Sequence, residues 1–233
     1  MSRTIVYVAH PDVATSSSQQ FLLSSGKQIT DVTYIDLQSE FENKGLFDSE
    51  KERARLLSYD RIIFQFHLYW YQAPAILKLW LDNVLQDRQM NSQFARQLVS
   101  KELGLVVVAG VNEGQYQAGG REKRTLSELL SPFESLAHYY NMTYLPIFSV
   151  HQFAYMSELE KMELMYQYAC YLVEGTHLSY LKYQRFLLEK LDTTESEQLN
   201  LSAEQEVLFE LWKNMLEDQA DEVSELFDLT DRW

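Results

Sequence analysis

The sequence contains a single cysteine, Cys170, in 233 residues. One cysteine excludes an intrachain disulfide framework and any metal site built from several cysteines, so no metal is expected. The sequence also lacks an uncharged apolar run of about 18 residues, so no membrane insertion is expected. The N-terminus lacks the long apolar core and the cleavage site of a signal peptide. Together these absences predict a soluble cytoplasmic protein.

Basic residues are scarce. Lys and Arg number 20 against 34 Asp and Glu, which gives a net charge of −14. Residues 192–233 hold 13 acidic and two basic residues, so residues 1–191 carry only −3. Because nucleic-acid binding depends on a basic face that neutralises phosphates, nucleic acid is not an expected partner. The acidic C-terminal segment is interpreted either as a solvated face or as an acidic docking face.

Short apolar runs alternate with helical patterns through residues 3–174, which predicts an α/β domain with a parallel sheet. The strands are expected at residues 3–10, 28–37, 61–66, 103–109 and 142–150. The helices are expected at residues 18–26, 48–58, 73–85, 122–140 and 158–174. Pro132 should kink or split the fourth helix. Residues 86–102 are expected to be an exposed excursion.

The sequence continues beyond these five βα units. Residues 1–176 are expected to form the main domain, and residues 177–233 an acidic helical extension. Two helices are expected there, at residues 177–191 and at residues 202 to about 227. The second carries an apolar stripe that must be buried against the same chain, a second copy or another protein. The stripe consists of Val207, Leu208, Leu211, Trp212, Met215 and Leu216.

The central stretch, residues 60–85, joins a buried strand to an amphipathic helix through an aromatic loop. The loop contains His67, Leu68, Tyr69, Trp70 and Tyr71. Ligands of open α/β sheets bind at the carboxyl ends of the strands, where this loop is expected to lie. The loop is therefore a candidate ligand wall. The alternative is that its aromatic side chains only cover the core.

Two further loops are candidates for the same edge. Residues 12–18, after the first strand, are rich in hydroxyls and lead into a helix. Backbone N–H groups at a helix N-terminus, together with Ser and Thr hydroxyls, form an anion site, although residues 16–18 could instead only cap the helix. Residues 110–120, after the fourth strand, contain four glycines, which allow a ligand to approach the backbone closely.

These residues carry a resemblance to a known family. The central stretch reads Phe66-x-Leu68-Tyr69-Trp70-Tyr71-x-x-Pro74-Ala75-x-Leu77-Lys78-x-Trp80-x-Asp82-x-Val84-Leu85. It resembles the signature of the flavodoxin-like NAD(P)H:quinone oxidoreductases, the family of DT-diaphorase, the modulators of drug activity and the ancillary subunits of potassium-efflux systems. The resemblance implies a flavodoxin-like, doubly wound five-stranded parallel sheet of order 2-1-3-4-5, with helices on both faces.

The resemblance also implies a tightly bound flavin, FMN or FAD, with NAD(P)H as co-substrate. The residues that fall on the family's flavin-binding positions are His10, Ser16, Ser17, Ser18, Gln19, His67, Leu68, Tyr69, Trp70, Tyr71, Val108, Ala109, Gly110 and Val111. Tyr116 falls on the family's active-site tyrosine and is expected to be catalytic. The implied activity is two-electron, ping-pong hydride transfer to a quinone or a similar flat acceptor.

The sequence departs from the family pattern at four places. Gln19 stands where Asn is usual, and the turn at residues 108–111 lacks the two usual threonines. Glu122 occupies the position of a histidine that assists hydride transfer in DT-diaphorase, so a histidine-assisted mechanism is not carried over. His67 replaces a proline; it either donates a hydrogen bond to a flavin carbonyl or points to solvent.

Three functions are compatible with this pattern. The first is a flavin-dependent NAD(P)H:quinone oxidoreductase that acts as a homodimer, with residues 73–85 and 110–120 near the interface. The second is a flavin-binding regulatory subunit of a membrane potassium-efflux transporter. The third, a flavodoxin-type electron carrier, does not require an aromatic pocket. The sequence does not distinguish FMN from FAD or NADH from NADPH, and it does not identify the physiological acceptor.

Overall fold

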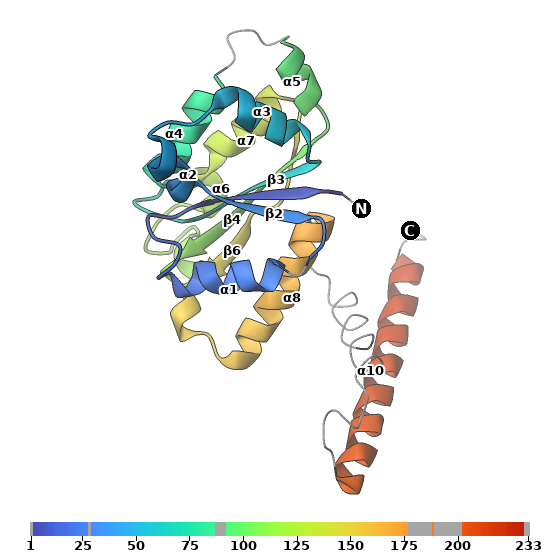
Figure 1. Ribbon diagram of the computed structural model, residues 1–233. Helices are drawn as coiled ribbons and strands as arrows, with labels where there is room; N and C mark the ends of the chain where they lie inside the picture. The colour runs from blue at the N-terminus through green and yellow to red at the C-terminus, as the bar shows by residue number, and fades with distance from the viewer. Residues whose placement is uncertain (1, 28, 87–91, 177–187, 189–201, 231–233) are drawn as a thin grey trace. The chain divides into compact units, whose positions relative to one another are not determined.

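Figure 1 shows the computed structural model, which describes all residues except 1, 28, 87–91, 177–187, 189–201 and 231–233. The chain divides into two compact units, Met1–His177 and Leu178–Trp233.

The first unit is built on one parallel sheet. Its strands are β1 (Thr4–Ala9), β2 (Val32–Asp36), β3 (Arg61–His67), β4 (Glu102–Ala109), β5 (Thr143–Tyr144) and β6 (Phe148–His151). The strand order is β2-β1-β3-β4-β5, with β6 also paired to β4, and every pairing is parallel. The expected doubly wound order is therefore confirmed.

The fifth expected strand is present in two pieces. β5 and β6 both pair with β4, and residues 145–147 between them are not in a strand. Pro146 lies in this gap, and proline has no backbone N–H to donate to a sheet ladder. β6 therefore adds a second short ladder, and its carboxyl end meets those of β1, β3 and β4.

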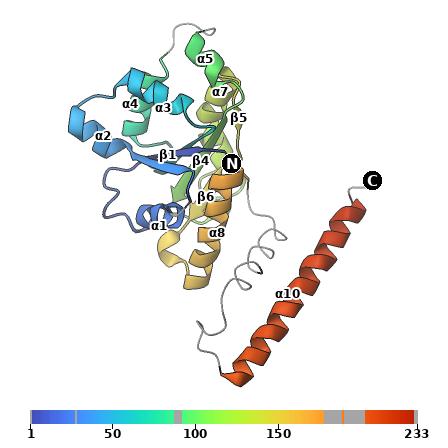
Figure 2. The ribbon, with the colours of Figure 1, turned by 45° about the vertical axis from the view of Figure 1, so that its right-hand side comes forward.

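Helices cover both faces of the sheet (Figures 1 and 2). One face is covered by α1 (Ser17–Gly26) and α8 (Glu158–Glu174). The other is covered by α2 (Leu37–Lys44), α3 (Ser49–Leu57), α4 (Ala75–Val84), α5 (Gln93–Leu98) and α7 (Ser131–Tyr139). Successive side chains of β1 alternate between the two cores: Ile5 and Tyr7 pack on the second face, and Val6 and Val8 on the first. This burial on both faces explains the continuous apolar runs of the strands.

Trp80 anchors α4 and with it the far end of the aromatic loop. Its side chain is fully buried, with its ring centroid 4.5 Å from that of Tyr7 and 5.6 Å from that of Phe64. Its indole N–H donates to a carboxylate oxygen of Glu52, on α3, at 3.3 Å. Because the helix that follows the loop is fixed at this point, the loop is held at both ends.

Two helices were not expected from the sequence. α2 follows β2 directly, because the Asp36 side chain accepts hydrogen bonds from the backbone N–H groups of Gln38 and Ser39 and so caps a new helix. α5 lies within residues 86–102, where Phe94 and Leu98 are buried. The expectation of an exposed excursion is therefore wrong for α5, and residues 87–91 lie outside the described residues.

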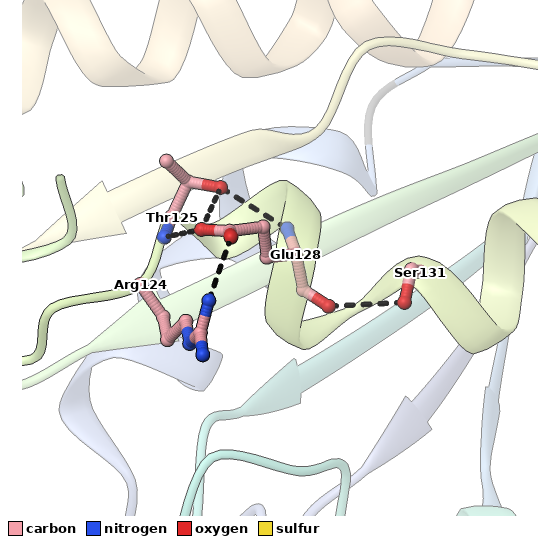
Figure 3. A network of polar contacts seen from close by, with 4 residues as sticks. All are labelled: Arg124, Thr125, Glu128 and Ser131. Atoms are coloured by element: carbon pink, nitrogen blue, oxygen red, sulfur yellow. Dashed lines mark hydrogen bonds and ion pairs between the residues drawn. The ribbon is translucent and has the colours of Figure 1, made fainter. Parts of the chain in front are cut away.

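The helix expected at residues 122–140 begins only at Leu126. It is split in two near Pro132, as the sequence predicted. Its first part, α6 (Leu126–Leu129), begins at a capping box, shown in Figure 3. The Glu128 N–H donates to the Thr125 hydroxyl at 3.1 Å, and the Glu128 carboxylate accepts from the Thr125 N–H at 2.7 Å. Arg124 donates to the same carboxylate, and the Ser131 hydroxyl donates to the Glu128 carbonyl at the junction with α7. Residues 120–125 are therefore not helical; they connect the glycine-rich loop to this capping box.

The second unit contains α10 (Ala203–Thr230). Its expected capping box is present, since the Ser202 N–H donates to the Gln205 side chain and the Gln205 N–H donates to the Ser202 hydroxyl. The apolar side chains of Val207, Leu208, Leu211, Trp212 and Met215 are exposed. The expected helix 177–191 lies outside the described residues, except for residue 188. In the described part of the chain, no helix is both long and apolar enough to cross a bilayer.

Candidate functional site

Four loops meet at the carboxyl edge of the sheet and line an open cavity of about 450 Å³. They follow β1, β3, β4 and β6. Eight residues expected from the sequence line this cavity: His10, Ser16, Ser17, Ser18, His67, Val108, Ala109 and Gly110. The fourth loop, Gln152 to Tyr155, was not expected in the site. Its only sequence signal was its position after an apolar strand at the same edge.

The N-terminus of α1 forms one end of the cavity. Ser16 is the N-cap, and its hydroxyl accepts from the Gln19 N–H at 3.4 Å. Ser17 and Ser18 are the first helical residues, where backbone N–H groups have no partner within the helix. The capping function and the anion-binding geometry therefore coexist in this loop. Both the dipole of α1 and its free N–H groups favour an anion at this end of the cavity.

Two histidines lie together beside this helix end. The ring centroids of His10 and His67 are 4.7 Å apart in an edge-on arrangement. The His10 Nδ1 accepts from the Asp12 N–H at 3.1 Å, so the neutral ring carries its hydrogen on Nε2, which donates to the Tyr69 hydroxyl at 3.2 Å. The His67 Nε2 hydrogen-bonds the Ser18 hydroxyl at 2.9 Å. Burial, together with the neighbouring His10, lowers the pKa of His67 to about 4.

The lowered pKa of His67 predicts a pH-dependent loss of stability. Between its ordinary pKa of 6.5 and the folded value of about 4, the unfolded chain binds a proton at this imidazole and the folded chain does not. Stability therefore falls as the pH falls through this window. Because the ring is partly exposed, we expect a loss of about 1–2 kcal/mol.

Urea unfolding of the flavin-free protein at several pH values measures this effect. The His67→Gln variant should lose less stability between pH 6.5 and pH 4 than the wild type. His138 is exposed on α7, so His138→Gln is the matched control and should behave as the wild type. Identical pH dependence of the wild type and His67→Gln would contradict the prediction.

The aromatic loop after β3 forms a tight turn. Tyr69 and Gln72 exchange two backbone hydrogen bonds of 3.0 Å, and the two residues between them have positive φ angles, 46° at Trp70 and 66° at Tyr71. Bulky residues rarely adopt this conformation, and it costs about 1–3 kcal/mol at each position. The turn leaves the Trp70 side chain 92% exposed at the edge of the sheet. The expected alternative, in which these rings only cover the core, does not apply to Trp70.

Glu122 connects the aromatic loop to the glycine-rich loop. Its carboxylate accepts from the Tyr71 hydroxyl at 2.8 Å and from the Arg121 side chain at 2.7 Å. Its own N–H donates to the Gln115 carbonyl at 3.1 Å. The hydrogen bond to Glu122 raises the pKa of Tyr71. The residue that departs from the family's histidine is therefore a structural link between two loops of the site.

Tyr116 lies near both Glu122 and His151. Burial, and then the Glu122 charge, raise the pKa of its hydroxyl. Its ring centroid is 6.0 Å from that of His151, at the end of β6. The His151 Nδ1 hydrogen-bonds the Val111 carbonyl at 2.9 Å, and its buried Nε2 has no hydrogen-bond partner among the described residues. A buried acceptor without a partner beside a tyrosine is an unusual feature, and it marks this side of the site.

The other expected site residues lie outside the cavity lining. Gln19 is fully buried and accepts from the Gln65 side chain at 2.7 Å, as part of a polar network in the core that includes Tyr168. The Leu68 N–H donates to the Val108 carbonyl. Tyr69, Trp70, Tyr71, Val111 and Tyr116 lie in the loops around the cavity rather than in its wall.

A larger cavity, of about 900 Å³, lies between α4 and α7. Its charged groups, Lys78 and Asp82, form an ion pair with each other. Its rim reaches Gln86, which adjoins residues outside the described set. The smaller cavity combines the N-terminus of α1, which favours anions, with two imidazoles and the backbone of Gly110. It is therefore the better candidate for the active site. Among the described residues, no group of three or more His, Cys, Asp or Glu is arranged to hold a metal ion.

Comparison with known proteins agrees with this fold. A family described as having the flavodoxin-like fold matches residues 2–170. The chain belongs to this family. A relative of this flavodoxin-like protein in Bacillus subtilis (strain 168), named "Uncharacterized NAD(P)H oxidoreductase YrkL", is 40% identical over 156 residues, which cover 67% of this chain and 89% of the relative.

Two solved structures are similar to this flavodoxin-like protein. An NADPH-quinone reductase from P. pentosaceus is 40% identical, with a TM-score of 0.66 over 73% of this chain and 97% of the other. The general stress protein 14 of Treponema denticola, solved in complex with FMN, is 29% identical, with a TM-score of 0.65 over the same shares. These relatives place the chain among oxidoreductases of this fold.

Proposed function

We propose that this protein is an FMN-dependent NAD(P)H:quinone oxidoreductase whose flavin lies at the carboxyl edge of the sheet. The observation that carries the proposal is the single cavity in which the serine-rich end of α1 meets the loops after β3, β4 and β6. The FMN complex and the quinone reductase among the relatives support the choice of cofactor and acceptor.

The residues present fit a flavin phosphate and a planar ring. The N–H groups and hydroxyls at Ser16, Ser17 and Ser18 suit a phosphate. A Cβ added at Gly110 would meet nothing within 4 Å, so a ligand has room to approach the backbone there. The buried Nε2 of His151 supplies an unpaired polar atom near the same edge.

The chain's own groups position the partners and hold protons. A bound flavin would supply two-electron redox chemistry, in ping-pong order, between NAD(P)H and a quinone. Trp70 offers an exposed aromatic surface for a flat partner. Tyr116 has a raised pKa and therefore keeps its proton at neutral pH, so its hydroxyl can donate to an acceptor oxygen. Glu122 fixes Tyr71 and so holds the aromatic wall against the glycine-rich loop.

The visible absorption spectrum of the purified protein tests the proposal. We expect a yellow protein that releases FMN on denaturation, as identified by mass, and that oxidises NADH or NADPH with menadione as acceptor. Release of FAD would correct the cofactor and leave the reaction class. A correctly folded protein that is colourless and takes up no added flavin at micromolar concentration would refute the proposal.

Replacing Tyr116 and Trp70 should have different consequences. Tyr116→Phe removes a proton donor and should lower turnover about tenfold with little loss of flavin. Trp70→Ala removes an aromatic face and should weaken flavin retention about fivefold. Flavin content after gel filtration and steady-state kinetics measure the two effects. Equal losses of flavin in both variants would contradict this division of functions.

Replacing Glu122 by glutamine should change the pH profile of the enzyme. The amide oxygen can still accept from Tyr71, but the negative charge that raises the pKa of Tyr71 and Tyr116 is removed. Both hydroxyls should therefore ionise at lower pH, and the alkaline limb of the kcat/KM profile should move to lower pH. Glu113→Gln, in the same loop, is the matched control. An unchanged alkaline limb in Glu122→Gln would show that this carboxylate does not act on the site.

The expected homodimer and the alternative function as a subunit of a potassium-efflux transporter remain predictions. Light scattering on the purified chain measures the oligomeric state directly. A variant that lacks residues 192–233 separates the two functions. Gel filtration and menadione reductase activity, measured on this variant and on the full chain, distinguish a catalytic protein from one whose acidic extension binds a partner.

A further inference from the structure

The cavity lining contains few groups that can carry a positive charge. Its described lining contains two imidazoles, His10 and His67, and no lysine or arginine. Lys161 is not in this lining; its ammonium lies 6.0 Å from the centroid of the ring of Phe153, a lining residue, and it pairs with Glu158. A phosphate monoester carries between one and two negative charges near neutral pH, because its second pKa is about 6. Helix N–H groups and hydroxyls can bind it but cannot neutralise it.

His10 is poorly suited to supply the missing charge. Its Nδ1 accepts from the Asp12 N–H and its Nε2 donates to the Tyr69 hydroxyl, so both ring nitrogens already have partners in the neutral form. Protonation would place a hydrogen on Nδ1 and break the hydrogen bond from Asp12. The Asp12 carboxylate itself accepts from Thr15.

His67, in contrast to His10, can accept a proton without losing its hydrogen bond. Its Nε2 pairs with the Ser18 hydroxyl, which can donate to a neutral ring and can turn to accept from a protonated one. The ring lies in the cavity wall beside the first turn of α1. The ionisable groups that surround it are His10 from the loop after β1 and Tyr69 from its own loop. Neither carries a negative charge at neutral pH in this arrangement, so a bound anion would supply the negative charge that an imidazolium lacks here.

We propose that His67 takes up a proton when a phosphate monoester enters the cavity, so that binding of the flavin phosphate is coupled to protonation of this imidazole. The inference rests on the proposed flavin site. In the ligand-free protein, burial holds the pKa of His67 at about 4, so the ring is neutral at pH 7. An anion at close range raises the pKa of a neighbouring group by about 1–3 units. The proton that enters with the phosphate then balances part of its charge.

The coupling predicts that FMN binds more tightly at low pH. In fluorescence titrations of the flavin-free protein, the dissociation constant for FMN should rise about tenfold between pH 5.5 and pH 8. Riboflavin, which lacks the phosphate, should bind with little pH dependence. His67→Gln keeps a partner for Ser18 but cannot take up a proton, so its FMN affinity should be weaker and much less dependent on pH.

A competing explanation places the proton on the phosphate itself. In that case the wild type and His67→Gln would show the same pH dependence, and this result would overturn the proposal. Titration calorimetry in two buffers of different ionisation enthalpy counts the protons taken up at pH 6, close to the pKa that a bound anion is expected to give His67. Uptake by the wild type that is lost in His67→Gln supports the proposal, and equal uptake by both opposes it.

Proton NMR of the wild-type imidazoles follows the protonation of His67 directly, without a measurement of affinity. The chain has 5 histidines, so the His67 resonance can be assigned by comparison with the variant. Its titration midpoint should rise when FMN is added, and also with inorganic phosphate. If FMN does not bind, the proposed function fails, and the phosphate titration still decides the behaviour of His67. A midpoint that saturating ligand leaves unchanged overturns the inference.

Discussion

Replacing Gly110 by valine is expected to lower the affinity for flavin by about 10- to 100-fold while leaving the ligand-free protein folded. Gly110 follows β4 and lines the cavity of about 450 Å³, and a Cβ added there would meet no atom within 4 Å. Its φ angle is not positive, so a side chain causes no backbone strain. A branched side chain would instead occupy space that the ligand needs, and overpacking by a few carbons costs about 1–3 kcal/mol.

Gly104 provides the contrasting variant. It lies within β4, where an added Cβ would approach the Tyr171 hydroxyl to 2.5 Å and the Ile63 side chain to 2.6 Å. Gly104→Ala should therefore lower the urea midpoint of unfolding, whereas Gly110→Val should not. Gly110→Ala should give an intermediate loss of affinity. If Gly110→Val binds FMN as the wild type does, the flavin does not approach this turn and the proposed site is misplaced.

The strands were predictable because most of them are local apolar runs, whereas their order, 2-1-3-4-5, was implied by the resemblance to the flavodoxin-like family. The continuous runs in β1, β3 and β4 show burial on both faces, and the loops after them carry serines, aromatic residues and glycines. Parallel strands bring the ends of these loops to one edge. The cavity could therefore be placed from the sequence alone.

The contacts within the site could not be predicted in the same way. The pairing of Tyr71 with Glu122 spans 51 residues and depends on the positive φ angles of a turn that bulky residues rarely form. The contact between His10 and His67 depends on the register of β1 against β3, which pairs Ala9 with Phe66 and so places the next residues side by side. In neither pair does the sequence around one residue indicate which residue it contacts.

The contacts of Arg61, at the opposite end of β3, also could not be predicted from the sequence. The sequence places a charged residue at the start of an apolar strand, where an exposed position is the usual outcome. The register of β3 against β4 instead pairs Arg61 with Glu102, and the guanidinium is buried. It forms an ion pair of 2.6 Å with Glu102 and donates to the Leu172 carbonyl at 2.7 Å. A Cβ added at Gly175, which has a φ of 72°, would meet Arg61 Nη2 at 2.9 Å.

Arg61→Met is therefore expected to lower the free energy of unfolding by about 3 kcal/mol, since it removes a buried ion pair and the donor to a carbonyl at the end of α8. Glu102→Gln is the matched control. Its amide oxygen can still accept from Arg61, but the buried guanidinium loses its opposite charge, so we expect a smaller loss of about 1–2 kcal/mol. Urea unfolding measures both values. A loss of less than about 1 kcal/mol from Arg61→Met would show that β3, β4 and α8 do not depend on this guanidinium, and that apolar packing alone sets their arrangement.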